Sequence, residues 1–158
     1  MRTASELVLY RDHGPLATAI GSRVTARRGK RAGLSWLIPP FLRALEYGTF
    51  IALTLTFAPD ALPACFALLS ALAFHHYDSV YRLRHQRIAP PQWVRFAGGG
   101  WELRLLIGCV LAVLGVLGPG MLIAAIALGA FHVTESVASW RRFTQPAAMY
   151  ETEEDEQE

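Results

Sequence analysis

Residues 101–140 decide the fold class, and they read WELRLLIGCVLAVLGVLGPGMLIAAIALGAFHVTESVASW. Within this stretch, residues 107–117 and 121–131 contain no charged side chain. A helix on the surface of a water-soluble protein shows a polar stripe every 3.6 residues, and neither run has one. A large soluble core could bury such helices, but a chain of 158 residues cannot wrap several of them. The stretch therefore predicts two membrane-spanning helices joined as an antiparallel hairpin.

Two more apolar segments precede this hairpin, and each approaches the length of about 20 residues that crosses a bilayer core. The whole chain is 53% hydrophobic and 18% charged, below the charged fraction of about 25% that is usual in soluble domains. We therefore predict an all-α, integral-membrane four-helix bundle in residues 34–143. Its spans are expected at 36–58, 61–81, 101–118 and 121–140, with the last two separated by Gly118-Pro119-Gly120. A basic segment (1–33) precedes the bundle, and an acidic disordered tail (144–158) follows it.

The distribution of basic residues predicts the orientation of the bundle. All of the 15 Lys and Arg residues except Arg43 lie on one side of the predicted spans. These fourteen residues precede the first span, connect the second span to the third, lie just inside the third span, or follow the fourth. The connections 59–62 and 118–120 contain no Lys or Arg. Since basic loops stay in the cytoplasm, we expect a multi-pass protein of the bacterial inner membrane with both termini cytoplasmic. The polybasic run 23–31 has no interleaved aromatic residues, so it favours anionic lipid over nucleic acid as a partner.

Ionisable side chains interrupt the cytoplasmic half of every predicted span, where they are costly and usually paired or functional. Arg43 and Glu46 are three residues apart, and His75, Asp78 and Arg82 form a single helical stripe. His76 is expected to point away from this stripe, toward lipid head groups. The candidate ligand-binding residues are Arg43, Glu46, His75, Asp78, Tyr81, Arg82, Glu102 and Arg104.

Three interpretations of these polar residues remain open. In the first, they are structural, with Arg43–Glu46 and Asp78–Arg82 paired within their own helices and the remainder reaching the interface. In the second, the arginines bind an anionic lipid head group or a nucleotide-activated alcohol, helped by Gly98-Gly99-Gly100 at the start of the third span. In the third, His and carboxylate residues on facing helices hold a metal ion. The candidate metal ligands are Glu46, His75, Asp78, His132 and Glu135.

The motifs RALEYGTF (43–50), ALLSALAFHHYDSVYRLRH (67–85) and GGGWELR (98–104) resemble an actinobacterial integral-membrane family classed as a domain of unknown function. That domain is often appended to proteins with a CDP-alcohol phosphatidyltransferase module, sometimes with a nucleotidyltransferase module ahead of it. The phosphatidyltransferase pattern DxxDGxxAR…GxxxDxxxD is missing from this sequence, and Asp78 has no second Asp three positions away.

The resemblance implies an accessory or head-group-binding module of phospholipid or CDP-alcohol metabolism. It would work beside a separately encoded CDP-alcohol phosphatidyltransferase and would not itself be a self-sufficient enzyme. A metal-dependent membrane enzyme and a purely structural subunit are the alternative functions. The sequence does not indicate a particular cofactor.

Overall fold

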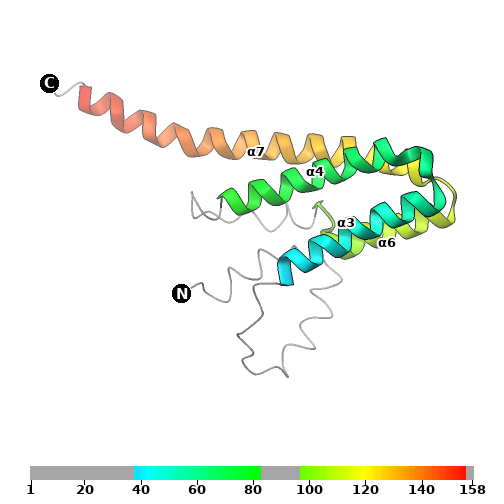
Figure 1. Ribbon diagram of the computed structural model, residues 1–158. Helices are drawn as coiled ribbons and strands as arrows, with labels where there is room; N and C mark the ends of the chain where they lie inside the picture. The colour runs from blue at the N-terminus through cyan, green and yellow to red at the C-terminus, as the bar shows by residue number, and fades with distance from the viewer. Residues whose placement is uncertain (1–37, 83–96, 156–158) are drawn as a thin grey trace.

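The computed structural model describes the backbone of residues 38–82 and 97–155 and the side chains of 39–82 and 97–141. This described part is all-α and contains no strand, as the sequence predicted. The basic segment 1–33 lies outside the described residues. The elements of the described part are α3 (Ile38–Phe57), a 3-10 turn η3 (Pro59–Ala61), α4 (Leu62–Tyr81), α6 (Gly100–Val113) and α7 (Leu117–Asp155), shown in Figure 1.

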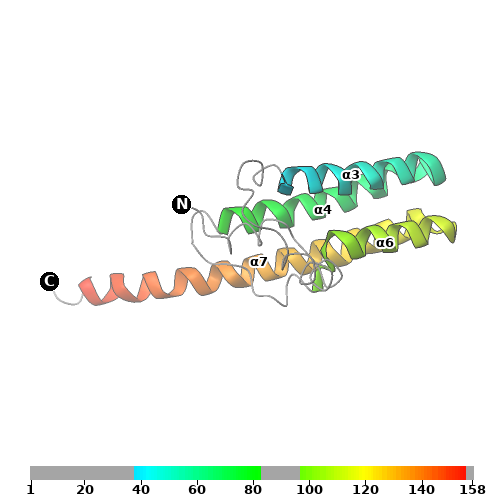
Figure 2. The same ribbon diagram turned by 90° about the horizontal axis from the view of Figure 1, so that it is seen from below.

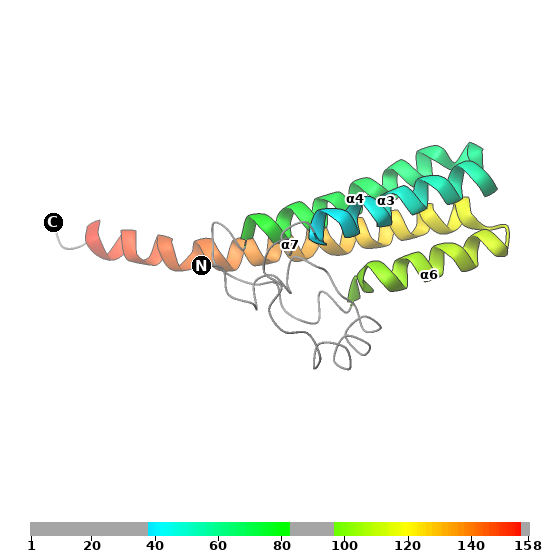
Figure 3. The ribbon, with the colours of Figure 1, turned by 60° about the horizontal axis from the view of Figure 1, so that its bottom comes forward.

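The helices form two antiparallel hairpins that pack side by side. α3 and α4 make one hairpin through η3, and α6 and α7 make the other. α4 lies along α7 (Figures 1 and 3), and α3 lies along α6 (Figure 1). Both hairpin turns lie at the same end of the bundle, so the start of α3, the end of α4 and the start of α6 lie together at the opposite end.

The turn between the last two helices lies earlier than the sequence predicted. α6 ends at Val113 and α7 begins at Leu117, so Gly118-Pro119-Gly120 belongs to the first turn of α7. The reversal occurs at Gly115, whose φ of 72° is in the left-handed region that glycine adopts without strain. Pro119 is tolerated because the first turn of a helix leaves its backbone N–H groups without intrahelical partners.

α7 also differs from its predicted extent. Its backbone stays helical through the segment expected to be a disordered tail, as far as Asp155. In Figure 2 this end projects well beyond the other three helices. Within the described residues, α7 over Leu117–Arg141 is the one helix that is long and apolar enough to cross a membrane by itself. α6 has only 14 residues, and α3 and α4 carry the charged and imidazole side chains described below.

Buried side chains divide the bundle into an apolar half and a polar half. The apolar core lies toward the hairpin turns and consists of Phe50, Cys65, Leu68, Leu72, Ala112, Leu117, Met121 and Ala125. Buried polar side chains lie toward the other end, apart from Thr54, and they are Glu46, His75, Arg82, Arg104, His132, Glu135 and Ser136. By contrast, all four helices expose large apolar side chains, such as Phe41, Phe66, Val113 and Ile126.

Candidate functional site

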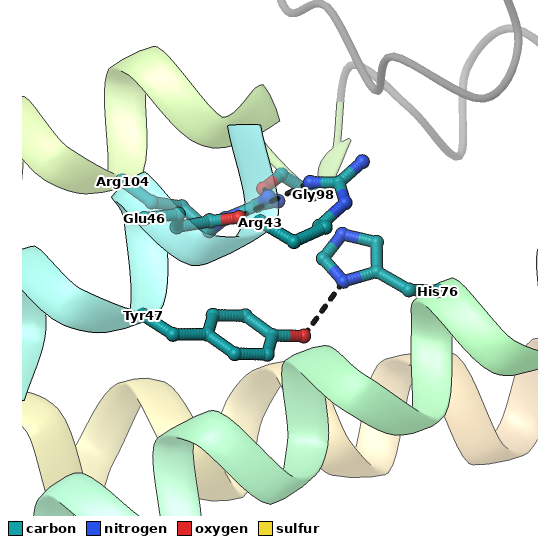
Figure 4. Close-up of polar contacts among 6 residues, drawn as sticks. All are labelled: Arg43, Glu46, Tyr47, His76, Gly98 and Arg104. Carbon is teal, nitrogen blue, oxygen red and sulfur yellow. Dashed lines mark hydrogen bonds and ion pairs between the residues drawn. The ribbon is translucent and has the colours of Figure 1, made fainter. Parts of the chain in front are cut away.

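The first polar group joins α3 to α6, and we call Arg43, Glu46 and Arg104 the α3–α6 cluster. Glu46 is fully buried and accepts hydrogen bonds from Arg104 Nε (2.7 Å) and Arg43 Nη1 (3.1 Å). Arg104 also donates from Nη1 to the carbonyl oxygen of Gly98 at 2.9 Å (Figure 4). Because a guanidinium stays protonated in proteins, two cations share one carboxylate and the cluster has a net charge of +1.

The second polar group joins α4 to α7, and we call Asp78, Arg82, Glu135 and Ser136 the α4–α7 cluster. Arg82 is 1% exposed and donates to both carboxylate oxygens of Glu135, from Nη1 at 3.0 Å and from Nη2 at 2.6 Å. Its Nη2 also contacts Asp78 Oδ2, and Ser136 Oγ donates to Asp78 Oδ1 at 2.9 Å. With both carboxylates ionised, the α4–α7 cluster has a net charge of −1.

Aromatic and imidazole side chains make further contacts of α4 with α7 and with α3. His75 of α4 stacks on His132 of α7, with ring centroids 3.9 Å apart and planes inclined by 19°. The neighbouring His76 points instead toward α3, where Tyr47 Oη lies 2.9 Å from its Nδ1 (Figure 4). We call the two clusters together with these four rings the polar layer. It contains side chains from all four helices at one end of the bundle.

A stack of aromatic rings borders the polar layer on its outer side. Tyr77 and Tyr81 of α4 have ring centroids 6.2 Å apart, and Tyr81 lies 5.8 Å from Trp140 of α7. Tyr77 is 70% exposed, and Trp140 is also exposed. Tyr and Trp with one exposed edge are typical of the level at which a membrane meets water.

Candidate residues on separate helices meet, since Arg104 contacts Glu46 and Arg82 contacts Glu135. The intrahelical pairs Arg43–Glu46 and Asp78–Arg82 are confirmed as well. Tyr81 lies at the edge of the layer, and Glu102 lies in the first turn of α6 and is partly exposed.

His76 points away from the His75/Asp78 stripe, as expected, but it faces Tyr47 of α3, so the expectation that it faces lipid head groups was wrong. Consecutive helical residues point about 100° apart, and α4 has a neighbour on both sides, so His75 faces α7 while His76 faces α3. Tyr47 and Ser136 also belong to the polar layer, although neither was among the candidate residues. The available signal for Tyr47 was its position next to Glu46, and for Ser136 its position next to Glu135.

The three carboxylates among the alternative metal ligands are already engaged in ion pairs, while His75 and His132 stack on each other. Asp78 and Glu135 both bind Arg82, and Glu46 binds Arg104. In the part of the chain that the structure describes, no three His, Cys, Asp or Glu side chains form a group that could hold a metal ion. The geometry favours ion pairing over metal ligation at these carboxylates.

A family model described as a family of unknown function, DUF5941, matches residues 13–156. The chain belongs to the DUF5941 family. This match confirms the resemblance to a domain of unknown function, and it includes every residue of the polar layer. Among curated proteins and among solved structures, none matches this DUF5941 chain.

Proposed function

We propose that this DUF5941 chain is a membrane-embedded accessory module that binds anionic lipid head groups at its polar layer. The observation that carries the proposal is the inverted distribution of side chains. The clusters of charged side chains are buried between the helices, while large apolar side chains cover the outside of all four. A soluble protein rarely exposes an apolar patch larger than a few hundred Å². A bilayer solvates such a surface without cost.

The dimensions of the helices support a membrane position. α3 and α4 have 20 residues each, which at 1.5 Å per residue gives about 30 Å, the thickness of the hydrocarbon core. The Tyr77–Tyr81–Trp140 stack would lie at one interface, and the polar layer would lie in the adjacent half of the bilayer. The positive-inside pattern of the sequence would make this the cytoplasmic half.

The α3–α6 cluster supports an anionic ligand. The cluster has a net charge of +1 and lies toward the end of the bundle opposite the hairpin turns. The Arg43 side chain is 16% exposed, while its partner Glu46 is fully buried. Arg43 could therefore contact a phosphate without giving up the buried pair between Glu46 and Arg104. A role in phospholipid or CDP-alcohol metabolism, beside a CDP-alcohol phosphatidyltransferase, rests on the sequence resemblance alone.

A purely structural subunit is the second candidate function. The observation in its favour is that Arg43, Arg82 and Arg104 each contact a carboxylate. In this alternative, the ion pairs neutralise charges that the bundle buries, and no ligand is involved.

Native mass spectrometry of the detergent-purified chain separates these candidates. We expect it to retain phosphatidylglycerol in preference to phosphatidylcholine of the same acyl chains. Arg43→Gln should lower the affinity for phosphatidylglycerol about tenfold or more, since a hydrogen bond to a charged group contributes about 1.5–3 kcal/mol. The matched control is Arg141→Gln, which removes the same charge from an exposed position on α7. Equal retention of both lipids, or no change in Arg43→Gln, would reject head-group binding and leave the structural role.

A further inference from the structure

An apolar groove opens from the α3–α6 cluster and runs between α6 and α7. It encloses about 260 Å³. Leu103, Ile107 and Leu111 of α6 form one wall, and Met121, Ala124 and Leu128 of α7 form the other. The groove is not sealed, because Ile107 is 49% exposed.

The two ends of the groove differ in polarity. Gly98, Gly99 and Arg104 line one end, and among the described lining residues Arg104 alone is charged. Arg104 belongs to the α3–α6 cluster, where two guanidinium groups share the carboxylate of Glu46. The rest of the lining is apolar side chain or glycine. A molecule complementary to this shape has a negative charge at one end and a hydrocarbon chain behind it.

We propose that the groove holds one acyl chain of the anionic lipid whose head group the α3–α6 cluster binds; this inference rests on the proposed function. Apolar cavities of about 150 Å³ in proteins stay free of water and take up benzene. By that comparison, the groove accommodates roughly ten carbons, which is a large part of an acyl chain. Insertion of the acyl chain through the side lined by Ile107 would bury it between α6 and α7.

Photo-crosslinking of the native chain tests the groove without any substitution. The probe is phosphatidylglycerol with a diazirine near the middle of one acyl chain, in vesicles of phosphatidylcholine. Met121 is 1% exposed but lines the groove, whereas Ile123 of the same helix is 68% exposed. The diazirine of a lipid outside the bundle can label Ile123, but only an acyl chain inside the groove can label Met121. We expect labelling of both, and labelling of Ile123 without Met121 would overturn the inference.

The second test is a substitution that fills the groove with a larger side chain, with a matched control on the same helix. Ala124→Phe occupies the groove, while Ala127→Phe adds the same ring at an exposed position outside the lining. In native mass spectrometry, Ala124→Phe should weaken phosphatidylglycerol binding about tenfold or more, because several methylene groups lose their burial. Ala127→Phe should stay within about twofold of the native chain.

The pattern of results distinguishes the inference from the proposed function. If Arg43→Gln weakens binding but Ala124→Phe does not, the proposal that the groove holds an acyl chain is overturned, and head-group binding stands. If the native chain does not prefer phosphatidylglycerol over phosphatidylcholine, head-group binding fails and the inference fails with it. The less bulky Ala124→Leu should give a smaller loss in the same direction as Ala124→Phe. Full phosphatidylglycerol affinity in a folded Ala124→Leu protein would contradict the groove.

Discussion

The guanidinium of Arg82 holds the carboxylate of Glu135 through two hydrogen bonds, 3.0 and 2.6 Å long, across 53 positions of the chain. This contact connects the end of α4 to the middle of α7, and so joins the two hairpins. It is almost completely buried, since the two side chains are 2% and 7% exposed. Loss of one partner would therefore leave the charge of the other buried and uncompensated, whatever ligand the polar layer binds.

Removal of the Arg82 charge should destabilise the bundle strongly. Arg82→Met leaves the buried Glu135 and the partly buried Asp78 without their cation, and breaking a buried pair on one side costs about 3–5 kcal/mol. Thermal unfolding in detergent measures the loss. The triple variant Asp78→Asn, Arg82→Met and Glu135→Gln should regain much of the stability, because it removes both negative charges that Arg82 neutralises. A single Arg82→Met variant as stable as the native chain would show that the pair is not formed.

Close contact between α3 and α6 depends on Gly108. A Cβ at this position would lie 2.8 Å from Cε1 of Phe50, which is 3% exposed and has little room to move. We expect Gly108→Ala to destabilise the protein by about 1–3 kcal/mol through overpacking. The double variant Gly108→Ala with Phe50→Leu should recover part of this loss.

Gly48 is the matched control for Gly108, because a Cβ there would meet no atom within 4 Å. Alanine favours the interior of a helix over glycine by about 0.5–1 kcal/mol, so Gly48→Ala should raise the unfolding temperature. The two substitutions are chemically identical and should have opposite signs. The same sign for both would contradict the described packing of α3 on α6.

The contact between Tyr47 and His76 should make a small, measurable contribution. Tyr47→Phe keeps the ring and removes the hydroxyl that lies 2.9 Å from His76 Nδ1. The loss should be about 1 kcal/mol in unfolding free energy, the typical value of one such hydrogen bond. Tyr77→Phe removes a hydroxyl from a side chain that is 70% exposed, and it should change the stability by less than about 0.5 kcal/mol. Equal effects of the two substitutions would argue against the α3–α4 contact.

Helical spacing was enough to predict the helices and the pairs within them. Runs of apolar residues located α3 and α4 to within a few residues of their observed ends. The pairs Arg43–Glu46 and Asp78–Arg82 followed from separations of three and four residues. The same spacing could not show that Arg104 reaches Glu46, since that contact depends on which helices are neighbours.

Turn positions and helix ends were harder to predict than the helices. Gly118-Pro119-Gly120 is a strong turn signal, yet its residues also suit the first turn of a helix, and the reversal occurs at Gly115. Acidic composition suggested a disordered tail because it offers no apolar face to pack. The backbone of α7 is nevertheless helical to Asp155, as a continuation of the span before it.

Spin-label accessibility in vesicles tests the central claim, the inverted distribution of side chains, most directly. Single labels at Leu55, Val113 and Ile126, in a chain whose Cys65 and Cys109 are replaced, report three exposed apolar positions on α3, α6 and α7. A fourth label at Asp60, exposed in the turn between α3 and α4, is the control. We predict that oxygen relaxes the first three labels much more than a water-soluble nickel chelate does, and that the chelate reaches Asp60. Equal access of the chelate to all four labels would contradict the account.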